Sequence, residues 1–140
     1  MKLFILTVSV SLLTPLFASA ASDPSKTSDI DQILAREESC LKTAISNTDM
    51  KVCAGNAFTE ADALLNEVYR TLSEPLKKST DKTEREILRR LVNSESTWIK
   101  FRDANCDYQG SVDLGGSQES LDILGCLGDM TVARIKELRK

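Results

Sequence analysis

Four cysteines are the side chains of this 140-residue chain best suited to a defined covalent role. They stand at Cys40, Cys53, Cys106 and Cys126, and no two of them form the Cys-x-x-Cys pair that is typical of zinc sites. An even number of cysteines in an exported protein indicates disulfides instead. We therefore expect two disulfides, for which four cysteines allow three pairings.

The sequence contains few side chains that are suited to catalysis. The sequence contains no histidine, which removes the usual general base near neutral pH and the Ser-His and Cys-His nucleophile pairs. Carboxylates stand close together at Glu37–Glu38, Glu60–Asp62 and Glu84–Glu86. Side chains one or two positions apart do not face each other on a helix, so none of these pairs is a preformed acid–base dyad. We predict no enzymatic activity, no cofactor and no metal.

The most distinctive stretch is Trp98–Cys106, which reads Trp-Ile-Lys-Phe-Arg-Asp-Ala-Asn-Cys. On a helix Trp98 and Arg102 share one face, so the guanidinium can stack on the indole ring. Asp103 lies one step round the helix and is expected to pair with a basic residue of the last helix, such as Arg134. Two interpretations remain open: a buried network that fixes helix packing, and an exposed aromatic–arginine hot spot for a partner.

A glycine-containing loop from Gln109 to Ser117 is the second candidate site. Its Gly115-Gly116-Ser117 sequence fits a turn between two helices, with Ser117 as the N-cap of the second, or a nest of amides for an anion. Loops tolerate partner contacts better than packed helix faces do. We therefore expect a partner-contact loop with the candidate residues Ser111, Gly115, Gly116 and Ser117.

Residues 1–20 have the layout of a secretory signal. Lys2 precedes an apolar run from Leu3 to Leu13, and Ala18-Ser19-Ala20 supplies small residues before the expected cleavage after Ala20. A membrane anchor needs about twenty apolar residues, and this run is shorter and is broken off by Thr14-Pro15. The sequence predicts a periplasmic or secreted protein with no membrane span in its mature chain.

The charge balance narrows the class of partner. Cleavage after Ala20 removes Lys2 from the 18 basic residues and leaves 17 against 21 acidic ones, a net charge of −4. Nucleic-acid binding needs clustered lysines and arginines against phosphates, so we expect no nucleic-acid partner. A negative field would instead attract a cationic protein.

Apolar residues recur every three or four positions in four segments, and no segment alternates with period two. Residues 21–28 are polar and predict a disordered leader, and residues 29–140 predict a single helical domain. The first helix is expected to begin at Ser28 or Asp29 and the second to be kinked or ended by Pro75. A capping box at Thr83 and Glu86 is expected to open the third. The prediction is an all-α protein, a compact bundle of about four helices arranged as two antiparallel hairpins.

The expected turns select one disulfide pairing. The turn at Asn47-Thr48 lies about midway between Cys40 and Cys53, and Gly115-Gly116 lies midway between Cys106 and Cys126. Helices that fold back at these turns bring each pair of sulfurs level. We predict Cys40–Cys53 and Cys106–Cys126, each stabilising the fold by about 3 kcal/mol on the chain-entropy model.

The ordered series of motifs resembles the LprI-like lysozyme inhibitor family of small bacterial exported domains. The series comprises Cys40, Met50, Cys53-Ala54, Phe58, Ala61-Asp62, Leu65-Asn66, Tyr69, Trp98, Phe101-Arg102-Asp103, Cys106, Gly115-Gly116-Ser117, Cys126, Thr131 and Arg134. The resemblance covers roughly residues 38–138 and implies a helical, disulfide-bonded domain that binds and blocks a lysozyme-type muramidase. The alternative function is that of a non-enzymatic periplasmic binding or immunity protein for another partner.

A lysozyme is a basic enzyme whose cleft carries catalytic carboxylates. An inhibitor that entered such a cleft would present a lysine, an arginine or a hydroxyl group to those carboxylates. The candidates near the expected loops are Lys77, Lys78, Lys82, Ser111 and Ser117.

Overall fold

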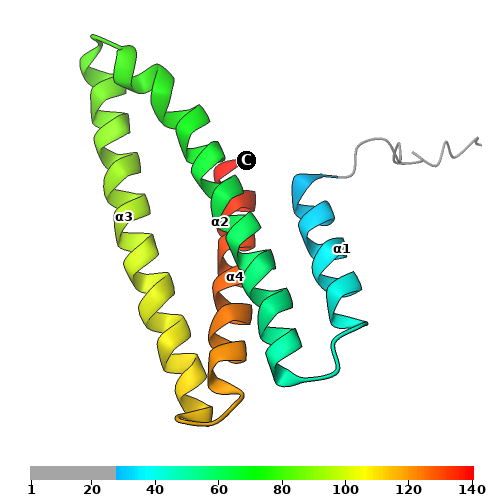
Figure 1. The fold of residues 1–140 in the computed structure, drawn as a ribbon. Helices are drawn as coiled ribbons and strands as arrows, with labels where there is room; N and C mark the ends of the chain where they lie inside the picture. Colours follow the sequence, from blue (N-terminus) through cyan, green and yellow to red (C-terminus); the bar gives the residue numbers. More distant parts are fainter. Residues whose placement is uncertain (1–27) are drawn as a thin grey trace, which may run out of the picture.

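Four α-helices build residues 28–140, the part of the chain that the computed structural model describes (Figure 1). The helices are α1 (Asp29–Leu41), α2 (Asn47–Lys78), α3 (Lys82–Gly110) and α4 (Glu119–Leu138), with the short 3-10 turn η2 (Ser111–Asp113) between α3 and α4. The described part contains no strand, so the all-α prediction is confirmed. The expected signal peptide and residues 21–27 of the expected leader lie outside the described residues.

Two antiparallel hairpins, α1–α2 and α3–α4, pack against each other as predicted (Figure 1). The core lies chiefly between α2 and α4, and Ala61 and Ile135 are fully buried there. The small side chains of Ala57 and Ala61 add little bulk to this face of α2, so neighbouring helices can approach it closely. The buried apolar cluster comprises Ile30, Ile33, Ala57, Ala61, Leu64, Leu65, Val68, Val132 and Ile135, with Trp98 and Leu138 packed against it.

Both predicted disulfides are present. Cys40 and Cys53 join α1 to α2 with their Cα atoms 5.6 Å apart, and Cys106 and Cys126 join α3 to α4 at 5.5 Å. Both bonds lie near the end of the molecule that carries the α1–α2 connection and the α3–α4 loop (Figure 1). We call this end the stapled end. The opposite end, where residues 79–81 connect α2 to α3, is called the hairpin tip.

Helix starts follow local hydrogen bonds, and two expected caps are wrong. Ser28 caps α1 as predicted, within a capping box that includes Asp31. The cap of α3 is Asp81, whose carboxylate accepts hydrogen bonds from the Thr83 and Glu84 amides. A carboxylate two residues before Thr83 satisfies these amides first, so the Thr83–Glu86 capping box does not form.

The start of α4 also differs from the prediction. Gln118 occupies the N-cap position, but its side chain accepts no hydrogen bond from the first amides of the helix and instead donates to the Asp122 carboxylate at 3.4 Å. Ser117 instead accepts a 3.1 Å hydrogen bond from the side chain of Asn47. This contact joins the α3–α4 loop to the first turn of α2, and so it brings two connections that are distant in sequence together at the stapled end.

Pro75 does not end α2, which continues to Lys78. The proline lies on the exposed side of the helix, where the missing amide costs one hydrogen bond but disturbs no packed neighbour. Figure 1 shows α2 bending near its C-terminal end. The bend leaves the hairpin tip projecting beyond the C-terminus of α4.

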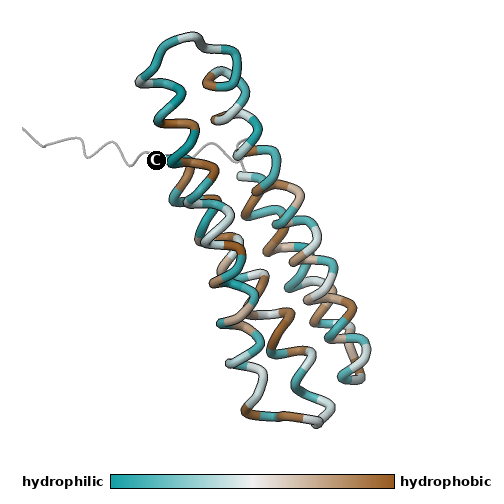
Figure 2. Tube along the Cα trace, turned by 90° about the vertical axis from the view of Figure 1, so that its left-hand side faces the viewer, coloured by the Kyte–Doolittle hydropathy of each residue, from teal (hydrophilic) through white to brown (hydrophobic). Residues whose placement is uncertain are grey.

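Several large apolar side chains remain on the surface, and the most exposed of them gather at the stapled end. Ile45 is 96% exposed in the α1–α2 connection, and Val112 and Leu114 are 87% and 78% exposed in the α3–α4 loop. Figure 2 shows hydrophobic positions in both connections. Within residues 28–140, no helix has the length and hydropathy needed to cross a membrane.

Candidate functional site

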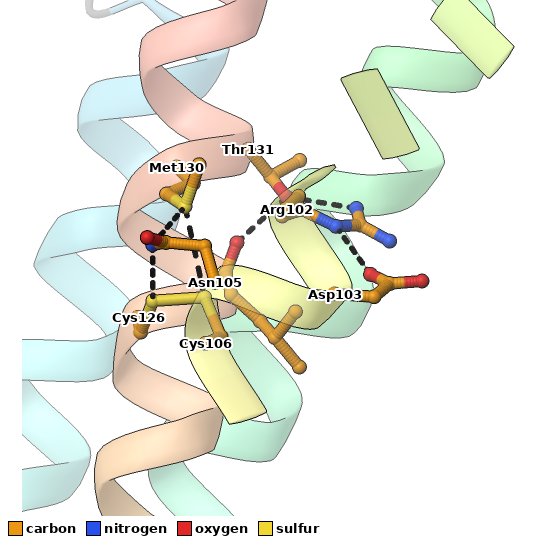
Figure 3. The surroundings of a disulfide bond; sticks show 8 residues. Arg102, Asp103, Asn105, Cys106, Cys126, Met130 and Thr131 are labelled. Atoms are coloured by element: carbon orange, nitrogen blue, oxygen red, sulfur yellow. Dashed lines mark hydrogen bonds and ion pairs between the residues drawn. A yellow bond between two sulfur atoms is a disulfide. The ribbon is translucent and has the colours of Figure 1, made fainter. Parts of the chain in front are cut away.

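Arg102 is the centre of a buried polar network that joins three helices. Its side chain donates hydrogen bonds to Asp62 on α2 at 2.9 Å, to Thr131 on α4 at 3.1 Å and to Asp103 on α3 at 2.9 Å. The guanidinium also lies 5.2 Å from the ring centroid of Phe58 and 5.3 Å from that of Trp98. Figure 3 shows Arg102 about one turn along α3 from the Cys106–Cys126 disulfide.

A second arginine lies on the same indole ring. Arg134 on α4 is 5.7 Å from the Trp98 centroid and pairs with the buried carboxylate of Glu95. It also donates to Ser94 at 2.8 Å and to Glu137 at 2.9 Å. The hydrogen bonds to Glu95 raise the pKa of Arg134 above its usual value.

The expected Asp103–Arg134 pair is wrong because the disulfide sets a different register. Trp98 precedes Cys106 by as many residues as Arg134 follows Cys126, so Trp98 and Arg134 lie level on the antiparallel α3–α4 hairpin. Asp103 stands too close to the disulfide to reach Arg134. It pairs with its own neighbour Arg102 instead.

The arrangement of this network suits helix packing. Arg102 is 6% exposed, and no buried side-chain nitrogen or oxygen in the described residues lacks a hydrogen-bond partner. Trp98 is half-buried against the core cluster. The donors and the ring faces are thus engaged within the domain, and the structure favours the packing interpretation over the exposed hot spot.

The α3–α4 loop turns its polar groups toward itself. The Gly115 amide donates to the Glu119 carboxylate at 2.8 Å, and the Ser111 hydroxyl donates to the Tyr108 carbonyl at 2.6 Å. Gly115 has a φ of +75°, a conformation that glycine adopts without strain. Because Glu119 occupies the nest, the loop presents the apolar side chains of Val112 and Leu114 rather than an anion site.

A groove runs between α1 and α4 and opens at this loop. Its volume is about 570 Å³, and its lining includes Glu37, Leu41, Val112, Leu121, Gly125 and Asp129. We call it the α1–α4 groove. Burial and the nearby charge of Asp129 raise the pKa of Glu37 above its usual value.

The groove was not identified from the sequence, although one signal for it was present. Glu37 interrupts the apolar stripe of the first helix at a position where a core residue would be expected. A carboxylate at such a position indicates that this part of the helix does not face a closed core. Which element lies opposite depends on how α1 and α4 pack on α2, and this is visible only in the fold.

Comparison with known protein families shows to which family this chain belongs. The family model described as lysozyme inhibitor LprI matches residues 40–138 of this chain. The chain belongs to the LprI family. One relative, the uncharacterized protein R02472 of Rhizobium meliloti (strain 1021), is 34% identical over 111 residues, which cover 74% of this chain and 78% of the relative. No solved structure matches the chain.

The LprI match begins at Cys40 and therefore includes both disulfides, the Arg102 network and the α3–α4 loop. Most of α1 precedes the match, so the LprI region supplies the α4 wall of the α1–α4 groove but only Leu41 of the α1 wall. Glu37, on the other wall, lies just outside the matched residues.

The LprI fold separates the residues that were expected to approach a lysozyme cleft. Lys77, Lys78 and Lys82 lie at the hairpin tip, whereas Ser111 and Ser117 lie at the stapled end. The 29 residues of α3 stand between the two groups, and at 1.5 Å per residue this is about 43 Å. One cleft cannot receive both groups, so a single mode of insertion does not involve all five.

Proposed function

We propose that this LprI domain is an exported, non-enzymatic inhibitor that binds and blocks a cationic lysozyme-type muramidase in the periplasm or outside the cell. Family membership and the two disulfides support export to an oxidising compartment. The expected signal at residues 1–20 supports the same destination.

One observation carries the choice of a cationic partner: the α3–α4 side of the stapled end combines exposed apolar surface with negative charge, while the lysines beside the α1–α2 connection, Lys42 and Lys51, are balanced in number by Glu38 and Asp49. From Asp103 to Ala133 the chain has six acidic residues and no lysine or arginine. A field of one sign speeds the encounter with a partner of the opposite sign, and the apolar side chains then supply area to bury.

The hairpin tip has the opposite charge. Between Arg70 and Arg90 the chain carries seven basic residues against four acidic ones. The tip would be repelled by a basic enzyme, except at the carboxylates of its cleft. We therefore propose that the stapled end makes the contact, through the loop residues Ser111, Gly115, Gly116 and Ser117, and that it obstructs the rim of the cleft.

A turbidity assay tests the proposal. The exported, oxidised protein is added to a basic c-type lysozyme acting on bacterial cell walls, at low and at high salt. We expect slower clearing, less slowing at high salt because exposed charges are screened, and no slowing after reduction of the disulfides. Undiminished clearing with every lysozyme type would overturn the proposal and favour the alternative, a periplasmic binding or immunity protein for another partner.

The same assay also tests for enzymatic activity. Asp129 lies close enough to Glu37 to contribute to raising the pKa of Glu37, and glycosidases use a pair of carboxylates. The protein alone is therefore added to the cell walls. A non-enzymatic inhibitor leaves them intact, whereas clearing by the protein alone would contradict this part of the proposal.

A further inference from the structure

We infer that the α1–α4 groove is the surface that binds the partner, and that it receives a segment carrying lysine or arginine side chains. The inference rests on the proposed function only for the identity of the partner. Its physical basis is the shape, the charge and the composition of the groove.

The groove is longer than its main hollow. A second, smaller hollow of about 110 Å³ shares Glu37, Gly125 and Asp129 with the first and extends it toward Ile33 and Val132. The two together run along the space between α1 and α4. The larger hollow has a volume within the roughly 300–1,000 Å³ of sites that hold small ligands, enough for several side chains of a partner.

The floor is kept open by a glycine that packing does not require. A Cβ atom added at Gly128 would lie 3.9 Å from the Cα of Phe58, so α4 passes close to α2 at that point. A Cβ atom added at Gly125 would meet nothing within 4 Å. Glycine inside a helix costs about 0.5–1 kcal/mol relative to alanine, and at Gly125 no contact within the domain accounts for that cost.

The groove carries negative charge that the domain leaves without cations. Glu37, Asp113, Asp122 and Asp129 all line it, and none of them has an ion-pair partner among residues 28–140. Burial and Asp129 raise the pKa of Glu37, as expected for a carboxylate that faces another negative charge.

Elsewhere on the surface some carboxylates are matched with cations, whereas others, such as Glu67 and Glu84, stand singly without an ion-pair partner among residues 28–140. Arg36, on the same helix as Glu37, donates a 2.9 Å hydrogen bond to Glu60. At the hairpin tip, Arg89 and Arg90 lower the pKa of Glu86 to about 2. The groove differs because it brings four unpaired carboxylates together along one hollow, and cationic side chains of a partner would neutralise them.

The apolar lining completes the fit. Leu41, Val112 and Leu121 lie beside the carboxylates in the same groove. Lysine and arginine have the corresponding form, because an aliphatic stem packs on apolar surface while the charged head meets carboxylates. Neutral or acidic segments would leave the four carboxylates buried without partners.

The test compares two double substitutions that change the net charge equally. Asp122→Asn with Asp129→Asn removes two charges from the groove, whereas Glu67→Gln with Glu84→Gln removes two exposed charges from elsewhere. Binding to a basic c-type lysozyme and to a synthetic octa-arginine peptide is measured at low salt. We expect the groove variant to weaken binding about tenfold and the control less than about twofold, because only the first loses close charge pairs. Equal weakening by both variants would overturn the inference.

A third variant tests shape without a change of charge. Gly125→Leu should fill the floor, improve helix propensity and weaken both complexes, with the thermal midpoint showing that the fold persists. Peptide titration of the unmodified protein, followed by amide shifts at Gly125 and Gly128, gives a readout that needs no variant. Shifts confined to the hairpin tip would contradict the inference.

The outcomes separate this inference from the proposed function. Inhibition of lysozyme that survives all groove substitutions would overturn the groove and leave the inhibitor function standing. Binding of octa-arginine in the groove with no effect on lysozyme would do the reverse. Failure to bind either probe would overturn both.

Discussion

Arg102 on α3 and Asp62 on α2 form an ion pair with 2.9 Å between nitrogen and oxygen, although 40 positions separate them in the chain. The arginine side chain is 7% exposed and that of the aspartate 40%. The pair thus extends from the interior to the surface. Arg102, its buried member, also donates a hydrogen bond to Thr131 on α4. One guanidinium fixes the relative positions of three helices.

Substitution of Arg102 by lysine should therefore destabilise the domain. An ammonium group cannot reach Asp62, Thr131 and Asp103 together, and it loses the planar stacking on Trp98 and Phe58. We expect the free energy of unfolding to fall by about 2 kcal/mol, less than the roughly 3–5 kcal/mol for removing one partner of a buried pair, because lysine keeps the positive charge. Urea unfolding measures this loss. Asp103→Asn is the control: that side chain is 56% exposed, and we expect less than about 0.5 kcal/mol. Equal losses would show that the buried network adds nothing.

The two disulfides should differ in what they protect. Cys40→Ser with Cys53→Ser releases α1, which packs on α2, so hydrogen exchange should speed up in α1 while α2, α3 and α4 stay protected. Cys106→Ser with Cys126→Ser removes the link that sets the α3–α4 register, and we expect a global loss of about 3 kcal/mol. Exchange mass spectrometry of both variants checks the contrast. Uniform loss of protection in the α1 variant would contradict it.

Substitution by alanine should change the stability in opposite directions at two helical glycines. A Cβ atom at Gly110 would lie 2.4 Å from Ile123 Cγ1 and 3.1 Å from the Glu119 carbonyl. Gly110→Ala should therefore cost about 1–3 kcal/mol, as overpacked sites do. Gly125→Ala has open space and should gain about 0.5–1 kcal/mol from helix propensity. Chemical denaturation of the pair tests both signs at once.

The stability of the domain should depend on pH through Glu37. Burial and Asp129 raise its pKa in the folded state, so the folded chain holds a proton more tightly than the unfolded one. Ionisation then costs stability as the pH rises above the usual range of a glutamate. Glu37→Gln should raise the stability of the protein slightly at neutral pH, where solvent screens the partly exposed carboxylate, and by nothing well below pH 4, where the carboxyl is already neutral in both states. Thermal unfolding midpoints of the variant and the unmodified protein, measured from below pH 4 to neutral pH, check this prediction. A gain that stays constant with pH would exclude an electrostatic cause.

Long-range features of the fold were predictable where they follow from periodicity and turn position. The spacing of apolar residues gave four helices, and the Gly115-Gly116 pair placed Cys106 and Cys126 level. The turn expected at Asn47-Thr48 was wrong by a few residues, because Ser46 caps α2 and Asn47 already begins the helix, but the connection at residues 42–46 still brings Cys40 and Cys53 level. Local starts were harder: several polar residues precede α3, and Asp81 rather than Thr83 supplies the cap. Sequence alone does not rank such neighbours, because each can accept the same amides.

The candidate site was less predictable because it depends on register and on packing between elements that are distant in sequence. Asp103 and Arg134 have complementary charges, but the Cys106–Cys126 bond sets Arg134 level with Trp98 and within reach of Glu95. The groove arises because α1 and α4 both pack on α2 and leave space between them. Only Glu37, a charge inside an apolar stripe, marked that space in the sequence.

The connectivity of the disulfides has a consequence for biogenesis. Each bond joins cysteines that are consecutive along the chain, separated by 13 and 20 positions. When a polypeptide emerges from a translocation channel amino terminus first, an oxidant that links each new thiol to the preceding one gives the native pairing at both bonds. The proposed export therefore predicts that maturation requires an oxidase but no disulfide isomerase, and strains that lack only the isomerase should accumulate the protein at normal yield.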